Sequence, residues 1–198
     1  MRRPNRQPLT ATTYLLLISV IILLRVCQIF GFGQNEFMSK TKTLKGEKMY
    51  KLAYELAEAA HDGQTRKDKK TPYFEHVKEV ASRVSGWDLK TVAILHDTIE
   101  DTTISDEFLR NKGFPKPIVD AVVALTKPKD CQDYLGEVRR RILPNKLARV
   151  VKISDNYANM RDRVTEWPKS PKARRKLHEY ASSIALLTKP KGKKKARE

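Results

Sequence analysis

The chain has 198 residues, with 40 lysines and arginines against 23 acidic residues, and therefore a formal net charge of +17. Its 40% hydrophobic and 32% charged residues are typical of a folded globular domain and exclude a collagen-like or low-complexity chain. The two cysteines, Cys27 and Cys131, are too few for a disulfide framework or a cysteine zinc cluster, which favours a reducing, cytoplasmic setting. The positive charge speeds encounters with anionic partners such as nucleotides, RNA or acidic membranes, without choosing among them.

Residues 1–37 form a hydrophobic N-terminal segment whose apolar centre, residues 14–24, follows a short basic stretch. A membrane-spanning helix needs about 20 apolar residues, so residues 9–33 reach that length only if Arg25 lies near one end. A secretory signal peptide also fits the apolar centre, although the residues that follow suit cleavage poorly. A third interpretation is that translation starts at Met38, which makes residues 1–37 an untranslated upstream extension. A membrane becomes a partner only if residues 9–33 are translated and retained, with the domain facing the cytosol.

From residue 44 onward, hydrophobic residues recur every three or four positions, which is typical of helices, and no stretch alternates with period two. We predict an all-α bundle over residues 44–187, followed by a solvated basic tail at 188–198. Ser105 has the residue type and following acids of a helix N-cap, and Gly63 is expected to cap the C-terminus of the first helix. The predicted helices cover residues 44–61, 73–84, 88–101, 105–113, 115–125, 132–142, 145–163 and 172–187.

The predicted helix 88–101 carries four titratable side chains at positions i, i+1, i+4 and i+5, namely His96, Asp97, Glu100 and Asp101. At 3.6 residues per turn these side chains share one helix face. Three carboxylates this close repel one another unless they are solvated or neutralised, and a divalent cation neutralises them effectively. The sequence therefore predicts a metal site on this helix.

A metal site needs more ligands than the adjacent pair His96 and Asp97 can offer. His76 lies in the middle of the preceding predicted helix, and Asp155 lies in an apolar stretch where a carboxylate without a partner is costly. These four residues form a candidate ligand set drawn from three helices. Taken alone, His76 is more often a core or surface histidine, and Asp155 is more often a cap or a salt-bridge partner.

Residues 50–163 resemble the HD-domain hydrolases of the RelA/SpoT type, and above all the small single-domain alarmone hydrolases. The resemblance rests on the segments AHDGQTRK (60–67), TPYFEH (71–76), LHDTIEDT (95–102) and VKISD (151–155), which agree with that family in order and spacing. It implies an HD-domain helical bundle. It also implies metal-dependent hydrolysis of the 3′-pyrophosphate of guanosine 3′,5′-bisdiphosphate, (p)ppGpp, to GDP or GTP and pyrophosphate.

The resemblance also implies a role for each residue of the site. The four candidate ligands named above are expected to hold one Mn²⁺ or another divalent ion. Glu100 and Asp101 are expected to handle the nucleophilic water and the proton transfer. An anionic nucleotide is expected to bind through Arg66 on the guanine, Lys67 at a phosphate and Asn159 near the sugar.

The chain departs from the family in two places. Val77 stands where a proline usually follows the first ligand histidine, and residues 127–134 resemble short HD proteins whose substrate is not established. The nearest alternative is therefore an HD phosphohydrolase that acts on another phosphorylated nucleotide, such as NADPH or a nucleoside phosphate. A second alternative is a non-catalytic, basic nucleic-acid-binding protein, although the intact ligand set argues against it and no specific nucleic acid is expected. We expect Tyr73 to pack in the core rather than to contact substrate.

Overall fold

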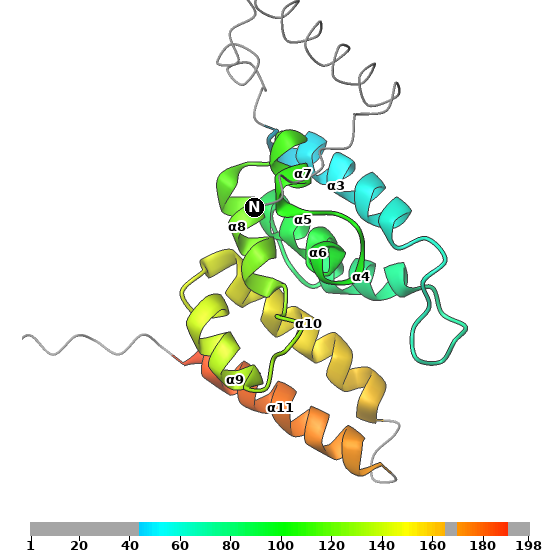
Figure 1. The fold of residues 1–198 in the computed structure, drawn as a ribbon, viewed down its shortest axis with the longest axis vertical. Coiled ribbons are helices and arrows are strands. Elements are labelled where there is room, and N and C mark those ends of the chain that lie inside the picture. The colour runs from blue at the N-terminus through cyan, green and yellow to red at the C-terminus, as the bar shows by residue number, and fades with distance from the viewer. Residues whose placement is uncertain (1–43, 165–169, 190–198) are drawn as a thin grey trace, which may run out of the picture. The chain divides into compact units, whose positions relative to one another are not determined.

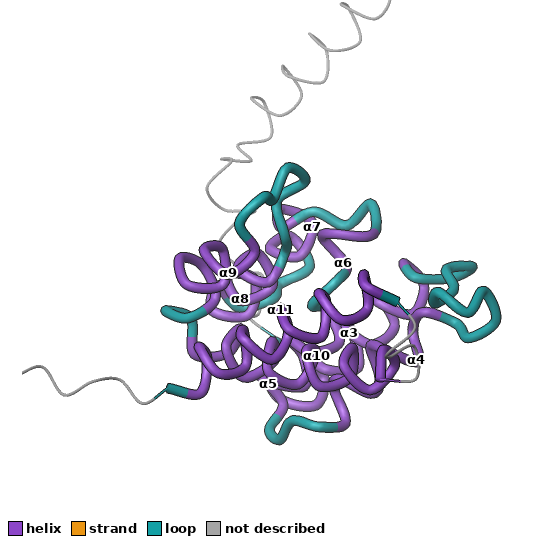
Figure 2. Tube along the Cα trace, turned by 90° about the horizontal axis from the view of Figure 1, so that it is seen from below, coloured by secondary structure: helices purple, strands orange, loops and turns teal. Residues whose placement is uncertain are grey.

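The computed structural model describes residues 44–164 and 170–189, and these residues form an all-α fold (Figure 1). The only β pairing among them is an isolated bridge between Thr65 and Pro72, and Figure 2 draws the rest as helix and loop. The predicted all-α class is confirmed. The N-terminal segment 1–37 and residues 190–198 of the basic tail lie outside the described residues. In the described ranges, no helix is long and apolar enough to cross a bilayer.

The helices match the predicted ones closely, with one exception at residues 96–97 that is described below with the site. Seven of the eight predicted helices agree with the observed ends to within two residues. The elements are α3 (Gly46–Ala60), α4 (Tyr73–Ser82), α5 (Trp87–Leu95), α6 (Thr98–Asp101), α7 (Asp106–Asn111), α8 (Lys116–Leu125), α9 (Tyr134–Glu137), the π-helix η1 (Val138–Ile142), α10 (Lys146–Val164) and α11 (Pro171–Thr188).

The two predicted helix caps have different outcomes. Ser105 caps α7 as predicted, because its Oγ accepts a hydrogen bond from the Phe108 N–H at 3.1 Å. Gly63 does not cap α3, because the helix ends at Ala60 with His61 as its C-cap. Gly63 instead lies two residues further on, in the turn that leads into the α3–α4 loop, with a φ of 73° that favours glycine.

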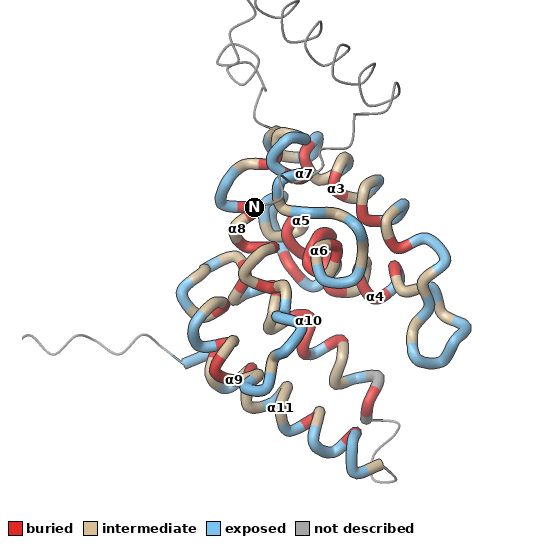
Figure 3. The backbone as a smooth tube through the Cα atoms, viewed as in Figure 1, coloured by how far each residue is buried: buried red, intermediate tan, exposed pale blue. Residues whose placement is uncertain are grey.

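Helix α5 forms the centre of the core, where it packs against α3, α4, α8 and α10 (Figure 1). Val92, Ala93, Ile94 and Leu95 have no exposed surface, and Figure 3 shows buried residues on the facing sides of the surrounding helices. A helix enclosed on all sides needs apolar residues around its whole circumference, which this segment supplies. The next residue, His96, therefore lies in the interior rather than on the surface.

Helix α10 packs against α4, α5, α8 and α11, and buried hydrogen bonds fix its register. The Ser154 hydroxyl donates to the Val80 carbonyl of α4 at 3.0 Å, and the Asn156 side-chain amide donates to the Ser183 hydroxyl of α11 at 2.9 Å. Breaking either bond would leave a buried polar group without a partner, so α10 is held against both neighbours. Asp155, which lies between these two residues, is thereby held beside α4.

Candidate metal centre and adjoining pockets

The continuous helix predicted over residues 88–101 is wrong, because the chain leaves the helix between α5 and α6. Asp97 has φ −103° and ψ −3°, in the sparsely populated bridge region. The Thr98 hydroxyl donates to the Leu95 carbonyl at 2.7 Å, and this carbonyl would accept a hydrogen bond from a backbone N–H if the helix continued. The four titratable residues therefore do not lie on one face of a regular helix. The bend instead directs Asp97 toward the two histidines.

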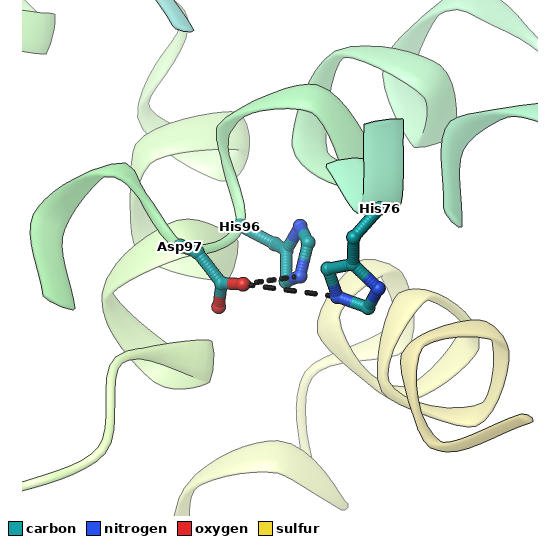
Figure 4. Close-up of side chains that lie close together, drawn as sticks. All are labelled: His76, His96 and Asp97. Atoms are coloured by element: carbon teal, nitrogen blue, oxygen red, sulfur yellow. Dashed lines mark ion pairs between the residues drawn. The ribbon is translucent and has the colours of Figure 1, made fainter. Parts of the chain in front are cut away.

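His76, His96 and Asp97 point toward one another (Figure 4). The Oδ2 atom of Asp97 lies 2.9 Å from Nε2 of His96 and 3.9 Å from Nε2 of His76. Potential ligand atoms of these three residues all lie within 4.8 Å of one another. Asp155 joins them from α10, since its Oδ1 lies 3.2 Å from Nε2 of His76 and 3.8 Å from Nε2 of His96. The structure thus brings the four predicted ligands together from α4, the α5–α6 junction and α10.

The hydrogen bonds of His96 determine which ring nitrogen faces the carboxylates. Its Nδ1 lies 2.8 Å from the Ala93 carbonyl, so Nδ1 carries a proton and donates it to that oxygen. Its Nε2 is buried and, among the described residues, has no hydrogen-bond partner despite lying close to Asp97. A cation coordinated by this nitrogen and by the carboxylate would satisfy both groups. The residues present therefore fit a divalent ion with imidazole and carboxylate ligands.

The carboxylates of Asp97 and Asp155 also favour a positive charge between them and His96. Burial disfavours a charged His96, but the carboxylates of Asp97 and Asp155 outweigh it and raise the pKa of His96 to about 10. Burial likewise disfavours charge on the two aspartates, yet His96 holds the pKa of Asp97 below its ordinary value, and Lys152 with both histidines does so for Asp155. The cluster is thus arranged to bind either a proton or a metal ion, which compete for the same place.

Three further side chains orient the two aspartates. The Tyr73 hydroxyl donates to Oδ2 of Asp97 at 2.5 Å. The Lys152 ammonium donates to Oδ2 of Asp155 at 2.8 Å, and the Asn159 side-chain amide donates to Oδ1 of the same carboxylate at 2.5 Å. Hydrogen bonds of this kind fix the direction of a ligand's lone pairs. Asn159, which the sequence resemblance predicts to lie near the nucleotide sugar, contacts a candidate metal ligand in the structure.

The expectation that Tyr73 packs in the core is met by its ring, which is half-buried and packs against the hydrophobic core, but the side chain also reaches the site. Its side chain lines both pockets beside the cluster, and its hydroxyl contacts Asp97. Burial, the charge of Asp97 and the hydrogen bond to it together raise the pKa of Tyr73, so the hydroxyl keeps its proton and acts as a donor. The sequence carried a signal for this position, because Tyr73 precedes His76 by three residues and so shares its helix face.

Glu100 and Asp101 line the smaller of the two pockets, together with Asp97 and Asp155. The Lys127 N–H donates to Oε2 of Glu100 at 2.7 Å, and the Lys127 ammonium lies 3.6 Å from Oε1. Burial, assisted by the charge of Asp97, outweighs this hydrogen bond and raises the pKa of Glu100. Burial and Asp97 raise the pKa of Asp101 as well. Carboxyl groups shifted in this direction exchange protons more readily near neutral pH.

Two pockets lined by both acidic and basic side chains adjoin the cluster, and Tyr73, Asn159 and Tyr180 line both of them. The smaller has a volume of about 180 Å³, and the larger of about 900 Å³. The predicted substrate residues Arg66 and Lys67 line the larger pocket. The cations that line the smaller pocket are Lys127, Arg141, Lys152 and Lys176.

Several of these pocket residues had no predicted role. Lys152 lies three residues before Asp155 on the same helix, so its position relative to the ligand could have been read from the spacing. Lys176 and Tyr180 belong to α11, and the sequence offers no signal that α11 reaches the site. Their contribution follows from the packing of α11 against α10.

One solved structure similar to this chain is described as "A metazoan ortholog of SpoT hydrolyzes ppGpp and plays a role in starvation responses". The similarity covers 73% of this chain and 88% of that chain, with a TM-score of 0.61 and 21% sequence identity. The fold is shared. This finding confirms the helical-bundle fold that the sequence resemblance implies. No family model matches the chain, and no curated protein matches it by sequence.

Proposed function

We propose that this protein is a metal-dependent hydrolase that removes the 3′-pyrophosphate of (p)ppGpp and releases GDP or GTP with pyrophosphate. The observation that carries the proposal is the convergence of His76, His96, Asp97 and Asp155 beside a pocket that further carboxyl groups and four cationic side chains line. The shared fold with a metazoan protein described as hydrolysing ppGpp supports this choice of substrate.

The proposed metal is Mn²⁺. Two imidazole nitrogens and two carboxylate oxygens form a ligand set of intermediate softness, which suits a divalent transition ion. When bound, such an ion supplies a water of lowered pKa and stabilises negative charge on phosphoryl oxygens. The buried cluster, with His96 Nε2 facing two carboxylates, supports the presence of such an ion.

Glu100 and Asp101 serve as the proton-transfer pair. Water attacks the phosphorus attached to the 3′ oxygen, so one carboxylate takes a proton from the water and the other carboxyl group gives a proton to the departing 3′ oxygen. The raised pKa values of both side chains support this exchange. General acid–base catalysis of this type contributes about 10²- to 10⁴-fold to a rate.

The two pockets suit the two parts of the substrate. A volume of about 180 Å³ is below the usual size of a small-molecule site but accommodates a diphosphate, and its lining supplies Lys127, Lys152 and Lys176. A volume of about 900 Å³ accommodates a nucleoside with its 5′ phosphates. Arg66 and Lys67 line this larger pocket, where the guanidinium can stack on a base and the ammonium can meet a phosphate.

The test is a substrate panel with product identification. The full chain is stripped of metal, supplied with Mn²⁺ and incubated separately with ppGpp, GTP and NADPH, and the products are resolved by anion-exchange chromatography. The control is the double variant His96→Ala/Asp97→Ala, with its helix content checked by circular dichroism. GDP and pyrophosphate formed from ppGpp by the intact protein alone are the expected result. Phosphate released from NADPH with no turnover of ppGpp would replace this proposal by the other-nucleotide alternative.

A further inference from the structure

One peptide unit, between Thr126 and Lys127, connects two charged side chains. Its N–H donates to Oε2 of Glu100 at 2.7 Å, and its carbonyl accepts a hydrogen bond from Nη1 of Arg141, also at 2.7 Å. Both bonds belong to the same amide group, so the carboxylate and the guanidinium lie at opposite ends of one dipole. We propose that Arg141 is a positioning residue that holds Glu100 in place through this peptide. The inference rests on the proposed function, in which Glu100 takes part in proton transfer.

Arg141 is itself held firmly at the end of α8. Its Nη2 donates to the Val123 carbonyl at 2.6 Å, so the planar guanidinium binds two carbonyls at once. The last carbonyls of a helix have no partner within the helix, and a cation is favoured at that end by the helix dipole. Glu137 lies one turn before Arg141, with its Oε2 3.8 Å from Nη1. Arg141 thus caps the C-terminal end of α8 and fixes the position of the Thr126–Lys127 peptide.

The place of Arg141 in the chain fits a role at the site. It lies in η1, a single turn of π-helix, and such turns are rare and often occur next to functional sites. The segment that contains Arg141 also lines the smaller pocket. Its side chain is 31% exposed, so its two carbonyl hydrogen bonds are partly sheltered from water.

Glu100 depends on this support because of where it lies. It belongs to α6, a helix of only four residues, and its side chain is 27% exposed. Lys127 meets both of its carboxylate oxygens, one through the N–H and one through the ammonium. A guanidinium that binds the carbonyl of an amide polarises that amide and strengthens its N–H as a donor. Arg141 therefore affects both the position of the Lys127 N–H and the strength of its bond to Glu100.

The test compares Arg141→Met and Arg141→Lys with Arg140→Met in the full chain. Arg140 is the matched control, because it lies on the same turn, is 60% exposed and pairs with Glu137 at the surface. The first readout is the NMR shift of the Lys127 amide proton, with Glu100→Gln as the reference for loss of the charged acceptor. Arg141→Met is expected to move this resonance toward its Glu100→Gln position, Arg141→Lys to move it partway, and Arg140→Met to leave it unchanged.

The second readout is the steady-state kinetics of ppGpp hydrolysis. Arg141→Met is expected to lower kcat by about 10- to 100-fold with little change in KM, because a catalytic group that is misplaced loses rate rather than binding. In a Glu100→Gln background the same substitution should lower kcat no further. Arg141→Lys should recover part of the rate, and it remains informative if the methionine variant folds poorly.

Two results would overturn the inference. A Lys127 amide resonance that Arg141→Met leaves in place would show that the guanidinium does not act through this peptide. A rise in KM with kcat preserved would show that Arg141 instead contacts the substrate directly. If the wild-type protein does not hydrolyse ppGpp, the proposed function fails, while the NMR comparison still decides whether Arg141 positions Glu100.

Discussion

The hydrogen bond from Tyr73 to Asp97 gives a prediction whose size follows from the structure. Tyr73→Phe removes one oxygen, which donates to Oδ2 of Asp97 at 2.5 Å, and keeps the ring that packs beside His61 and His76. A hydrogen bond to a charged group contributes about 1.5–3 kcal/mol. Loss of a residue that orients a metal ligand typically lowers metal affinity about 10- to 100-fold, or about 1.4–2.8 kcal/mol. Because the two ranges agree, we expect Tyr73→Phe to weaken Mn²⁺ binding by about 10- to 100-fold.

The assay is isothermal titration of Mn²⁺ into the metal-stripped protein at a fixed pH. Tyr54→Phe is the matched control, because this α3 tyrosine packs edge-on against Phe74, with ring centroids 5.0 Å apart, and lies outside both pockets. The control should bind Mn²⁺ as the wild type does. A change of less than twofold in Tyr73→Phe would refute the reasoning, as would an equal loss in both variants.

Other predictions address the proposed proton-transfer residue Glu100, the core and a helix cap. Glu100→Gln should retain Mn²⁺ binding but lower kcat by about 10²- to 10⁴-fold, and near-normal turnover would remove Glu100 from the proposed proton transfer. Carbon-13 NMR titration of the metal-free protein should give Glu100 a pKa above its ordinary value of 4.5, because burial and the charge of Asp97 favour the protonated form; a midpoint at or below 4.5 would contradict this. Ile94→Ala, at a fully buried position of α5, should lower the free energy of unfolding by about 2–5 kcal/mol in urea denaturation, and a loss below about 1 kcal/mol would argue against the described core. Ser105→Ala should cost about 1 kcal/mol in the same experiment, because the Phe108 N–H loses its capping partner, whereas an unchanged stability would deny the cap.

The helices were predictable because most of them bury only one face. Helix α3 is an example, since Met49, Ala53 and Ala57 recur at helical spacing and are its buried residues. The interruption at Asp97 was not predictable in this way, because helical residues flank it on both sides. The hydroxyl of Thr98 that captures a backbone carbonyl looks no different, in sequence, from a threonine on a helix surface.

The four candidate metal ligands could be predicted from the sequence because of the chemistry of their side chains. Burying a histidine or an aspartate without a partner costs folding free energy, so His76 and Asp155 could be linked to the adjacent His96 and Asp97 before their distances were known. The contribution of α11 could not be predicted, because Lys176 and Tyr180 reach the pockets only through the packing of helices far apart in the chain. The three interpretations of residues 1–37 and the solvated basic tail stay predictions, as does the domain boundary at residue 44.

The central claim is that a single divalent ion at the four-residue cluster is required for hydrolysis of ppGpp. The most direct measurement is the rate of pyrophosphate release by the metal-stripped full chain as Mn²⁺ is added in steps up to several equivalents. The account predicts no release without metal, and a bound Mn²⁺ content that saturates at one ion per chain as the rate reaches its plateau. It also predicts that Asp155→Ala abolishes both Mn²⁺ binding and pyrophosphate release. Turnover by the wild-type protein before any Mn²⁺ is added would contradict the account. Turnover by Asp155→Ala when the variant has bound no Mn²⁺ would contradict it as well.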